Sequence, residues 1–270
     1  FITHFHTDHI GLVSDLATES TKIYMNAPDA RRMLAGGFAQ IFEKAALLHG
    51  FPQNELKKAI EDHPASKYGP QLPLPFTETH DGQMITVGDY NFRCVETPGH
   101  SLGHTCLYET RQKILISGDH ILNDITPNLQ AWIEDWNPLE EYLVSLKKTA
   151  TLDVALVLPG HRTIFHDMLR RIDELIEHHE KRAEEILLIL KEGPKTAYQV
   201  ASKMTWDIVS DSFDLFPLPQ RWFASGESIA HLRHLEGLGR VRREMREHRG
   251  QELAFWSLCP EFSGTRVSFR

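Results

Sequence analysis

The sequence is poor in cysteine, and its three cysteines, Cys94, Cys106 and Cys259, lie far apart. An odd number of widely spaced thiols with no CxxC pair makes neither a disulfide framework nor a thiolate zinc site. A reducing compartment is therefore expected, and we predict a cytoplasmic location. The chain also lacks an apolar run of about 20 residues, the length that a membrane helix needs, so no membrane partner is expected.

Positive charge is scarce as well. The chain has 29 Lys and Arg against 37 Asp and Glu, which gives a formal net charge of −8 and no bulk attraction to nucleic acid or anionic membranes. The GxSxG motif of serine hydrolases is absent. With 41% hydrophobic and 24% charged residues, the composition is that of a globular protein, and 270 residues suffice for about two domains.

Histidine and aspartate, in contrast, are concentrated where apolar runs end. Residues 1–12, FITHFHTDHIGL, hold four such side chains directly after an apolar start. Three later apolar runs end in TPGHS, ISGDH and LPGH, so that a glycine precedes the polar residue each time. Glycine allows a sharp backbone turn, and strand ends on one edge of a sheet lie close together. The sequence therefore predicts one site made of His4, His6, Asp8, His9, His100, Asp119 and His161.

The residue types in this set are those of a metal centre. All seven are imidazoles or carboxylates, which suit zinc foremost, with iron or manganese as alternatives. Seven ligands exceed the capacity of one tetrahedral ion, whereas two divalent ions roughly 3.5–4 Å apart and bridged by a carboxylate would use them all. Taken singly, HFHTDH could be a solvated loop and each later histidine a turn residue. Their joint occurrence favours the metal site.

HFHTDH followed by PGH, SGD and PGH resembles the metallo-β-lactamase fold superfamily, in its hydrolase branch with a glyoxalase II-like HxHxDH motif. The resemblance implies an α/β (α+β) fold, the αββα sandwich. It also implies a first metal held by His4, His6 and His100, a second held by Asp8, His9 and His161, and Asp119 as the bridge. Asp8 would in addition be catalytic, by orienting the attacking hydroxide. The family has several strands before HxHxDH, so we expect a fragment or an incomplete first half-sheet.

Other histidines near these motifs have no place in the ligand set. His104, in HSLGH, is predicted to act in the second shell or structurally, by holding a ligand rather than a metal. His120 is predicted to be a bystander. His178 and His179 lie in a charged helical pattern and are predicted to face solvent.

The C-terminal third has a different pattern. Helices are predicted over 172–193, over 195–204 with Thr196 as N-cap, and over 225–241 beginning at Ser225, followed by two strand-like pieces. This order resembles a winged helix, as found in one group of β-lactamase-like hydrolases. We therefore expect a catalytic domain over 1–168, with a helical insertion at about 28–63, and a winged-helix-like domain over 169–270. The run LDVALVL, 152–158, predicts a last strand of the catalytic domain that is buried on both faces.

The partner of the C-terminal domain is left open by the sequence. Five arginines near the wing suggest nucleic acid, namely Arg240, Arg242, Arg243, Arg246 and Arg249. Glu244 and Glu247 are interleaved among them, so nucleic acid is the less favoured partner. The alternative is packing against the catalytic domain or a second subunit, as in a homodimer.

A small-molecule substrate is favoured by the apolar residues of the insertion. Phe38 and Phe42, together with Trp132 and Trp136, are candidate walls of a substrate pocket, and a plain helix–helix core is the alternative. We predict a binuclear metal-dependent hydrolase that uses a metal-bridging hydroxide to cleave a thioester, a lactone or a related ester. The alternatives are a metal-dependent endoribonuclease acting on single-stranded RNA and a non-catalytic, metal- or ligand-sensing winged-helix regulator.

Overall fold

The computed structural model describes residues 1–36, 38–248, 250–261 and 264–269, without the side chains of Phe38 and Ala65. The chain divides into two compact units. Unit 1 comprises Phe1–Gly36, Pro64–Pro127 and Glu140–Leu175, and unit 2 comprises Gly37–His63, Asn128–Leu139 and Ile176–Arg270. Each unit is thus assembled from three separate stretches, whereas the sequence led us to expect a linear boundary after residue 168, which stays a prediction.

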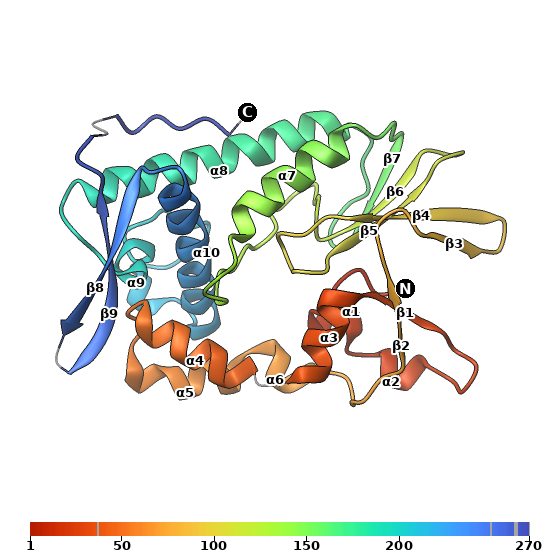
Figure 1. The fold of residues 1–270 in the computed structure, drawn as a ribbon, viewed down its shortest axis with the longest axis horizontal. Coiled ribbons are helices and arrows are strands. Elements are labelled where there is room, and N and C mark those ends of the chain that lie inside the picture. Colours follow the sequence, from red (N-terminus) through yellow and green to blue (C-terminus); the bar gives the residue numbers. More distant parts are fainter. Residues whose placement is uncertain (37, 249, 262–263, 270) are drawn as a thin grey trace. The chain divides into compact units, whose positions relative to one another are not determined.

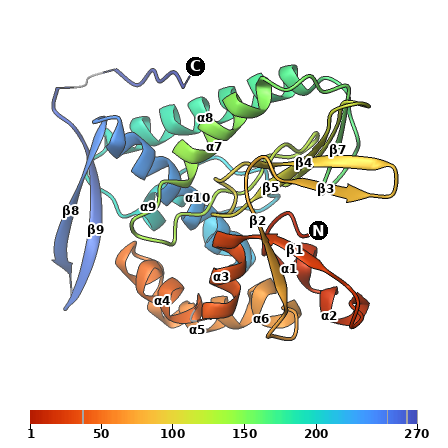
Figure 2. The ribbon, with the colours of Figure 1, turned by 45° about the vertical axis from the view of Figure 1, so that its right-hand side comes forward.

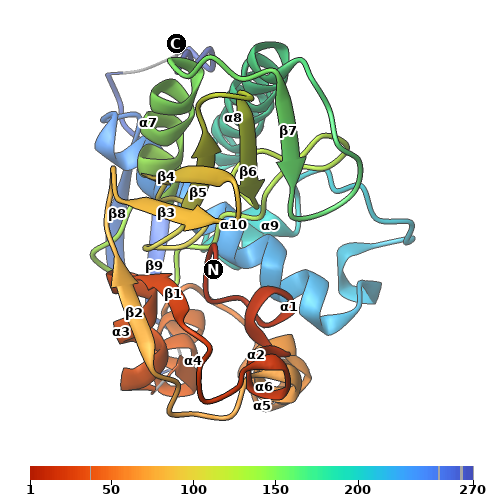
Figure 3. The same cartoon turned by 90° about the vertical axis from the view of Figure 1, so that its right-hand side faces the viewer.

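Unit 1 contains a five-stranded sheet in the order β3-β4-β5-β6-β7 (Figure 3). The strands are β3 Met84–Val87, β4 Tyr90–Glu96, β5 Thr105–Glu109, β6 Ile114–Gly118 and β7 Leu156–Pro159. The first four are antiparallel neighbours, and β7 joins β6 in parallel. Val87 pairs with Tyr90 across the turn at Gly88-Asp89, so that β3 and β4 form a hairpin.

The last strand is shorter and more exposed than predicted. In β7 only Val157 is buried, and β7 lies at the end of the strand order with β6 as its neighbour. The expectation of a strand buried on both faces was therefore wrong. An apolar run shows that a strand packs on a core, but it does not distinguish a central strand from an edge strand.

Small helices and a strand pair complete unit 1 around a second core. The elements are α1 Thr7–Ile10, α2 Val13–Leu16, β1 Ile23–Asn26, α3 Ala27–Ala35, α6 Pro64–Tyr68, β2 Phe76–Thr79 and most of α7 Pro138–Ala150. The strands β1 and β2 are parallel. Ile2, Ile10, Met25 and Met33 are buried together there. Asn26 occupies the N-cap position of α3, but its side chain donates a hydrogen bond to Glu96 instead of capping the helix.

Unit 2 is mainly helical (Figure 1). It contains α4 Phe38–Leu48, α5 Gln53–Asp62, the greater part of α8 Met168–Leu190, α9 Ala197–Ala201, the short 3-10 helix Phe213–Leu215, α10 Leu218–Gly237, and the antiparallel strands β8 Val241–His248 and β9 Gln251–Leu258. Helices α4 and α5 pack against one another (Figure 2). No helix in the described part of the chain is long and apolar enough to cross a membrane.

Of two helix N-termini predicted in unit 2, one is confirmed and one was placed wrongly. Thr196 is the N-cap of α9, as predicted, and it forms a full capping box with Gln199. The helix expected to begin at Ser225 instead begins at Leu218, after Pro217 and with Pro219 in its first turn. Proline at the first helical positions is a start signal, because its fixed φ suits a helix and its missing N–H costs no hydrogen bond there.

The prediction of a solvent-facing His179 was also wrong. Its side chain is buried, and its Nδ1 lies 3.1 Å from Nε2 of His231 on α10. His231 Nδ1 in turn donates to the carbonyl oxygen of Glu227, at 2.9 Å. On α8, His179 shares a helix face with the buried Ala183 and Ile186. Because histidine is polar, the pattern of apolar residues did not predict that this position is buried.

Candidate metal centre

The structure brings the seven predicted side chains together within unit 1. His4 and His6 lie in the extended segment before α1, and Asp8 and His9 lie in α1 itself. The other three follow strand ends: His100 lies between β4 and β5, Asp119 directly after β6, and His161 after β7. The glycine-preceded residues therefore meet the opening histidines at one edge of the sheet.

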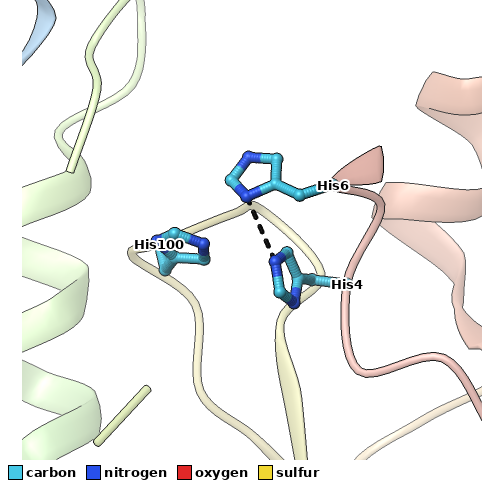
Figure 4. A group of neighbouring side chains, drawn as sticks. All are labelled: His4, His6 and His100. Carbon is cyan, nitrogen blue, oxygen red and sulfur yellow. Dashed lines mark hydrogen bonds between the residues drawn. The ribbon is translucent and has the colours of Figure 1, made fainter. Parts of the chain in front are cut away.

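One group consists of His4, His6 and His100, whose ligand atoms all lie within 4.8 Å of one another. The rings face a common point (Figure 4). His4 Nε2 lies 3.1 Å from His6 Nδ1. The ring centroid of His100 lies 4.7 Å from that of His4 and 4.5 Å from that of His6.

A second group consists of Asp8, His9 and His161. His161 Nε2 lies 3.1 Å from Asp8 Oδ2 and 3.3 Å from His9 Nε2. This group is more open than the first, since the side chains of Asp8 and His161 are 57% and 36% exposed, whereas His4 is fully buried. The centre therefore has a closed side and a side that faces solvent.

Asp119 reaches both groups. Its Oδ2 lies 3.5 Å from His100 Nε2 and 3.4 Å from His161 Nε2, and its Oδ1 lies 3.3 Å from His9 Nε2. Although burial raises the pKa of Asp119, its contacts with His9, His100 and His161 lower that pKa below the ordinary value. Asp119 is therefore an anion at neutral pH, placed between two sets of nitrogen ligands.

This arrangement fits divalent metal better than it fits hydrogen bonding among the side chains themselves. His9 Nε2 faces Asp119, His161 and Asp8 at 3.3, 3.3 and 3.8 Å, yet a ring nitrogen carries at most one hydrogen. Burial, followed by the charge of His6, holds the pKa of His4 well below its usual range, so this imidazole is neutral and keeps a lone pair for a metal. Converging lone pairs with few protons among them are what a cation requires.

Two glycines of the motifs are required by close packing. A Cβ on Gly160 would lie 2.4 Å from Asp119 Oδ1 and 2.8 Å from His9 Cε1. Gly118 has a φ of +49°, and a Cβ there would lie 2.7 Å from His104 Nε2. Both positions exclude a side chain because the ligand residues at Gly160 and the ring of His104 at Gly118 occupy the space.

His104 is fully buried beside Asp119. Its Nε2 accepts a hydrogen bond from the backbone N–H of Asp119 at 3.1 Å, so in the neutral ring Nδ1 carries the hydrogen and donates it to Thr97 Oγ1 at 2.8 Å. Burial lowers the pKa of His104 well below its usual range, which keeps the ring neutral. These contacts support the predicted role of His104 in holding a ligand.

Asp29 was missed by the sequence reading. It lies in the first turn of α3, is fully buried, and accepts hydrogen bonds from Phe5, Ser101 and Gly103. Burial raises its pKa to about 6, against the opposing effect of these hydrogen bonds. An acid in the first turn of a helix is a common favourable placement, so the sequence offered no sign of a second role.

The predicted substrate walls belong to unit 2, where the structure shows two of them, Phe42 and Trp132, in an aromatic cluster. Trp132 is buried, with its ring stacked on Trp222 at 4.3 Å, and Phe42 lies 6.5 Å from Trp132. Trp136 is half-buried, and the side chain of Phe38 lies outside the described residues. The substrate role of these residues stays a prediction.

The arginines of the wing are largely paired. Arg242 and Arg246 form ion pairs with Glu244, at 3.2 and 2.8 Å. Arg243 pairs with Glu134, and Arg240 donates to the carbonyl oxygens of residues 264 and 266. Arg249 lies outside the described residues. Three of the four described arginines of the wing therefore lie beside a carboxylate, and two of these three share that of Glu244.

Two family models match separate parts of the chain. Residues 1–161 match the family model of the metallo-beta-lactamase superfamily, and residues 183–251 match the model of a metallo-beta-lactamase-like C-terminal domain. A metallo-beta-lactamase family protein from Thermus thermophilus is 28% identical, with a TM-score of 0.75 over 95% of this chain and 78% of its own. A beta-lactamase domain protein from Burkholderia ambifaria is 28% identical, with a TM-score of 0.78 over 96% and 74%.

Curated relatives match over shorter stretches. The Beta-lactamase-like protein 2 homolog of Caenorhabditis elegans is 28% identical over 191 residues, which cover 71% of this chain and 51% of that protein. The Atrochrysone carboxyl ACP thioesterase of Aspergillus fumigatus is 32% identical over 111 residues, 41% of this chain and 33% of that protein. The chain spans about half the length of the curated relatives it matches most fully.

Proposed function

Since the chain belongs to the metallo-beta-lactamase superfamily, we propose that it is a metal-dependent hydrolase of acyl substrates, such as a thioester, a lactone or a related ester. The observation that carries the proposal is the convergence of seven histidine and aspartate side chains on one sheet edge, with Asp119 in reach of both groups. In this reading HFHTDH acts as a glyoxalase II-like HxHxDH motif.

The proposed centre holds two divalent ions, zinc foremost. His4, His6 and His100 would hold the first, Asp8, His9 and His161 the second, and Asp119 both. Divalent ions in such a site lower the pKa of a bound water to near neutrality and polarise a carbonyl oxygen. Asp8 has the most exposed carboxylate of the set, so it can accept a hydrogen bond from an attacking water and orient it. Asp119 supplies negative charge between the ligand groups, and His104 holds its backbone.

An acyl substrate is favoured over RNA by two observations. One relative carries the name of a thioesterase, which cleaves an acyl bond to a carrier protein thiol. On the wing, Arg242 and Arg246 share the single carboxylate of Glu244, which offsets part of the positive charge that a nuclease would use to meet phosphates. Cleavage of single-stranded RNA is thus the weaker alternative, and a purely regulatory protein would have no need of so many converging ligands.

The remaining parts of the proposal concern the rest of the chain. We propose that 169–270 forms a winged-helix-like domain that packs within the protein or in a homodimer. Cys94, Cys106 and Cys259 are free thiols, which supports a cytoplasmic location.

The test compares three substrate classes on one preparation. Protein loaded with zinc, iron or manganese is assayed in parallel on an acyl thioester, a lactone and single-stranded RNA, with bound metal measured by elemental analysis. We expect two ions per chain and turnover of the thioester or the lactone. Protein that holds no metal after reconstitution, or that cleaves RNA alone, would refute the proposal.

A matched variant separates the two enzyme hypotheses. Arg242→Gln with Arg246→Gln removes two exposed charges of the wing and leaves the structural pairs of Arg240 and Arg243 in place. Hydrolysis of a small ester should be unchanged. If RNA is the substrate, its cleavage should weaken and become less dependent on salt.

A further inference from the structure

The buried carboxylate of Asp29 joins the two loops that carry His4, His6 and His100. We propose that Asp29 is a positioning residue of the metal centre: it sets the mutual geometry of these three histidines through the backbone segments that carry them. The inference rests on the proposed function, because it requires that the histidines bind a metal.

The contacts of Asp29 divide between the two loops. Its Oδ2 accepts from the backbone N–H of Phe5 at 3.2 Å and from Ser101 Oγ at 2.6 Å, and its Oδ1 accepts from the N–H of Gly103 at 2.7 Å. Phe5 lies between His4 and His6 in the chain, and Ser101 follows His100 directly. A single rigid carboxylate therefore fixes the separation of two segments that are about 95 residues apart in sequence.

The surroundings of Asp29 leave it no freedom to move. The residue is fully buried in the first turn of α3. A Cβ on Gly103 would lie 2.7 Å from the Asp29 nitrogen and 2.9 Å from its Cγ, so the glycine lets the loop approach the carboxylate closely. A shift of Asp29 would consequently be transmitted to both loops.

The path from Asp29 continues to the proposed bridging ligand. Gly103 precedes His104, whose Nε2 accepts from the backbone N–H of Asp119. Loosening the 100–104 loop would therefore disturb His100 directly and Asp119 through His104. Outer hydrogen-bond partners of this kind typically change metal affinity by about 10–100-fold when they are removed.

The competing explanation is that Asp29 only stabilises the fold, as an acid at a helix N-terminus and as a hydrogen-bonded core residue. The two explanations differ in what happens to folded protein. A structural role predicts a lower unfolding temperature with an unchanged metal site. A positioning role predicts an altered metal site in protein that remains folded.

Three variants test the proposal. In Asp29→Asn, the amide oxygen can keep only the donors of one carboxylate oxygen, and the new NH₂ group faces a backbone N–H that the other oxygen used to accept. Ser101→Ala removes a single hydrogen bond and is the milder change, chosen so that folding is retained. Asp15→Asn is the control, since Asp15 is an exposed acid on α2. Each protein is stripped with a chelator and titrated with cobalt(II), whose visible spectrum reports ligand geometry, while circular dichroism follows the fold.

We expect Asp29→Asn to raise the cobalt dissociation constant about 10–100-fold and to change the visible spectrum. Ser101→Ala should show a smaller change in the same direction, and Asp15→Asn should match the wild type. Wild-type affinity and spectrum in folded Asp29→Asn or Ser101→Ala would overturn the positioning role alone. If the wild-type chain itself binds no cobalt, the proposed function fails and the positioning role falls with it.

Discussion

Acid should destabilise unit 2 through a histidine far from the metal ligands in sequence. His49 lies between α4 and α5, is 1% exposed, and its ring lies parallel to that of Trp256, with the centroids 6.3 Å apart. Burial, followed by the charge of Arg233, lowers its pKa to about 3 against the opposing effect of Glu134. In the unfolded chain the pKa of histidine is about 6.5. Below pH 6.5, His49 therefore becomes protonated in the unfolded state but stays neutral in the folded state, so acid favours unfolding.

The size of the effect follows from this difference in pKa. Between about pH 6.5 and pH 3, each pH unit of acidification costs about 1.4 kcal/mol of unfolding free energy for this one residue. From pH 7.5 to pH 5.0 the loss is about 2 kcal/mol, because little of the change occurs above pH 6.5. A loss of that size is a substantial part of the stability of a typical domain.

The substitution His49→Phe removes the titrating group and keeps an aromatic ring beside Trp256. Among the described residues, neither ring nitrogen of His49 has a hydrogen-bond partner, so the change breaks no hydrogen bond. The Oε2 atom of Glu134 lies 3.9 Å from His49 Nε2, which is beyond hydrogen-bond distance. The variant should therefore lose about 2 kcal/mol less stability than the wild type between pH 7.5 and pH 5.0.

Tryptophan fluorescence makes the assay specific for unit 2. All five tryptophans lie in that unit: Trp132, Trp136, Trp206, Trp222 and Trp256. Urea unfolding followed by fluorescence at pH 7.5 and pH 5.0 gives the two free energies for each protein. His248→Gln, an exposed position on β8, is the control and should behave as the wild type does. If His49→Phe loses as much stability as the wild type on acidification, His49 is protonated in the folded unit and the argument from burial is wrong.

Four further substitutions test the metal centre and the capping of a helix in unit 2. Asp119→Asn should abolish measurable turnover and lower the metal content, because it removes the charge shared by both ligand groups. His104→Ala should lower turnover less, by about 10–100-fold. Near-normal activity and full metal content in Asp119→Asn would contradict the bridging role of Asp119. Gly160→Ala should lower metal content, measured against Gly264→Ala, since a Cβ at Gly160 meets Asp119 whereas one at Gly264 meets nothing within 4 Å. Thr196→Ala removes the cap of α9 and should lower the stability of unit 2 by about 1 kcal/mol, whereas the exposed Ser202→Ala should have little effect.

The candidate ligands could be found in the sequence because their signals are local. Each of His100, Asp119 and His161 follows a glycine at the end of an apolar run, and the reason is physical: a side chain at Gly118 or Gly160 would collide with neighbouring residues of the site. Each ligand follows the end of its strand by one to four residues, a distance at which sequence patterns are informative.

Asp29 and His179 could not be found in the same way. The partners of Asp29 lie 24 to 74 residues away along the chain, and one of them is a backbone N–H of a glycine, which no side-chain pattern marks. His179 is buried because α10 supplies His231, 52 residues further on. In a charged helix a histidine is predicted to be exposed, because burial requires a hydrogen-bond partner that the local sequence does not reveal.

The helices at 38–62 are a further case in which the sequence predicts burial but not the packing partner. Their apolar faces predict burial, but an amphipathic pattern does not say against what. In unit 2 the ring of Phe42 lies within 6.5 Å of both Trp132 and Trp222, residues that follow it by 90 and 180 positions. Trp132 is 4% exposed and stacked on Trp222, so almost none of its surface is open to a ligand without rearrangement. Substitution of Trp132 should therefore lower the stability of unit 2, whereas the substrate role of the half-buried Phe42 and Trp136 stays a prediction.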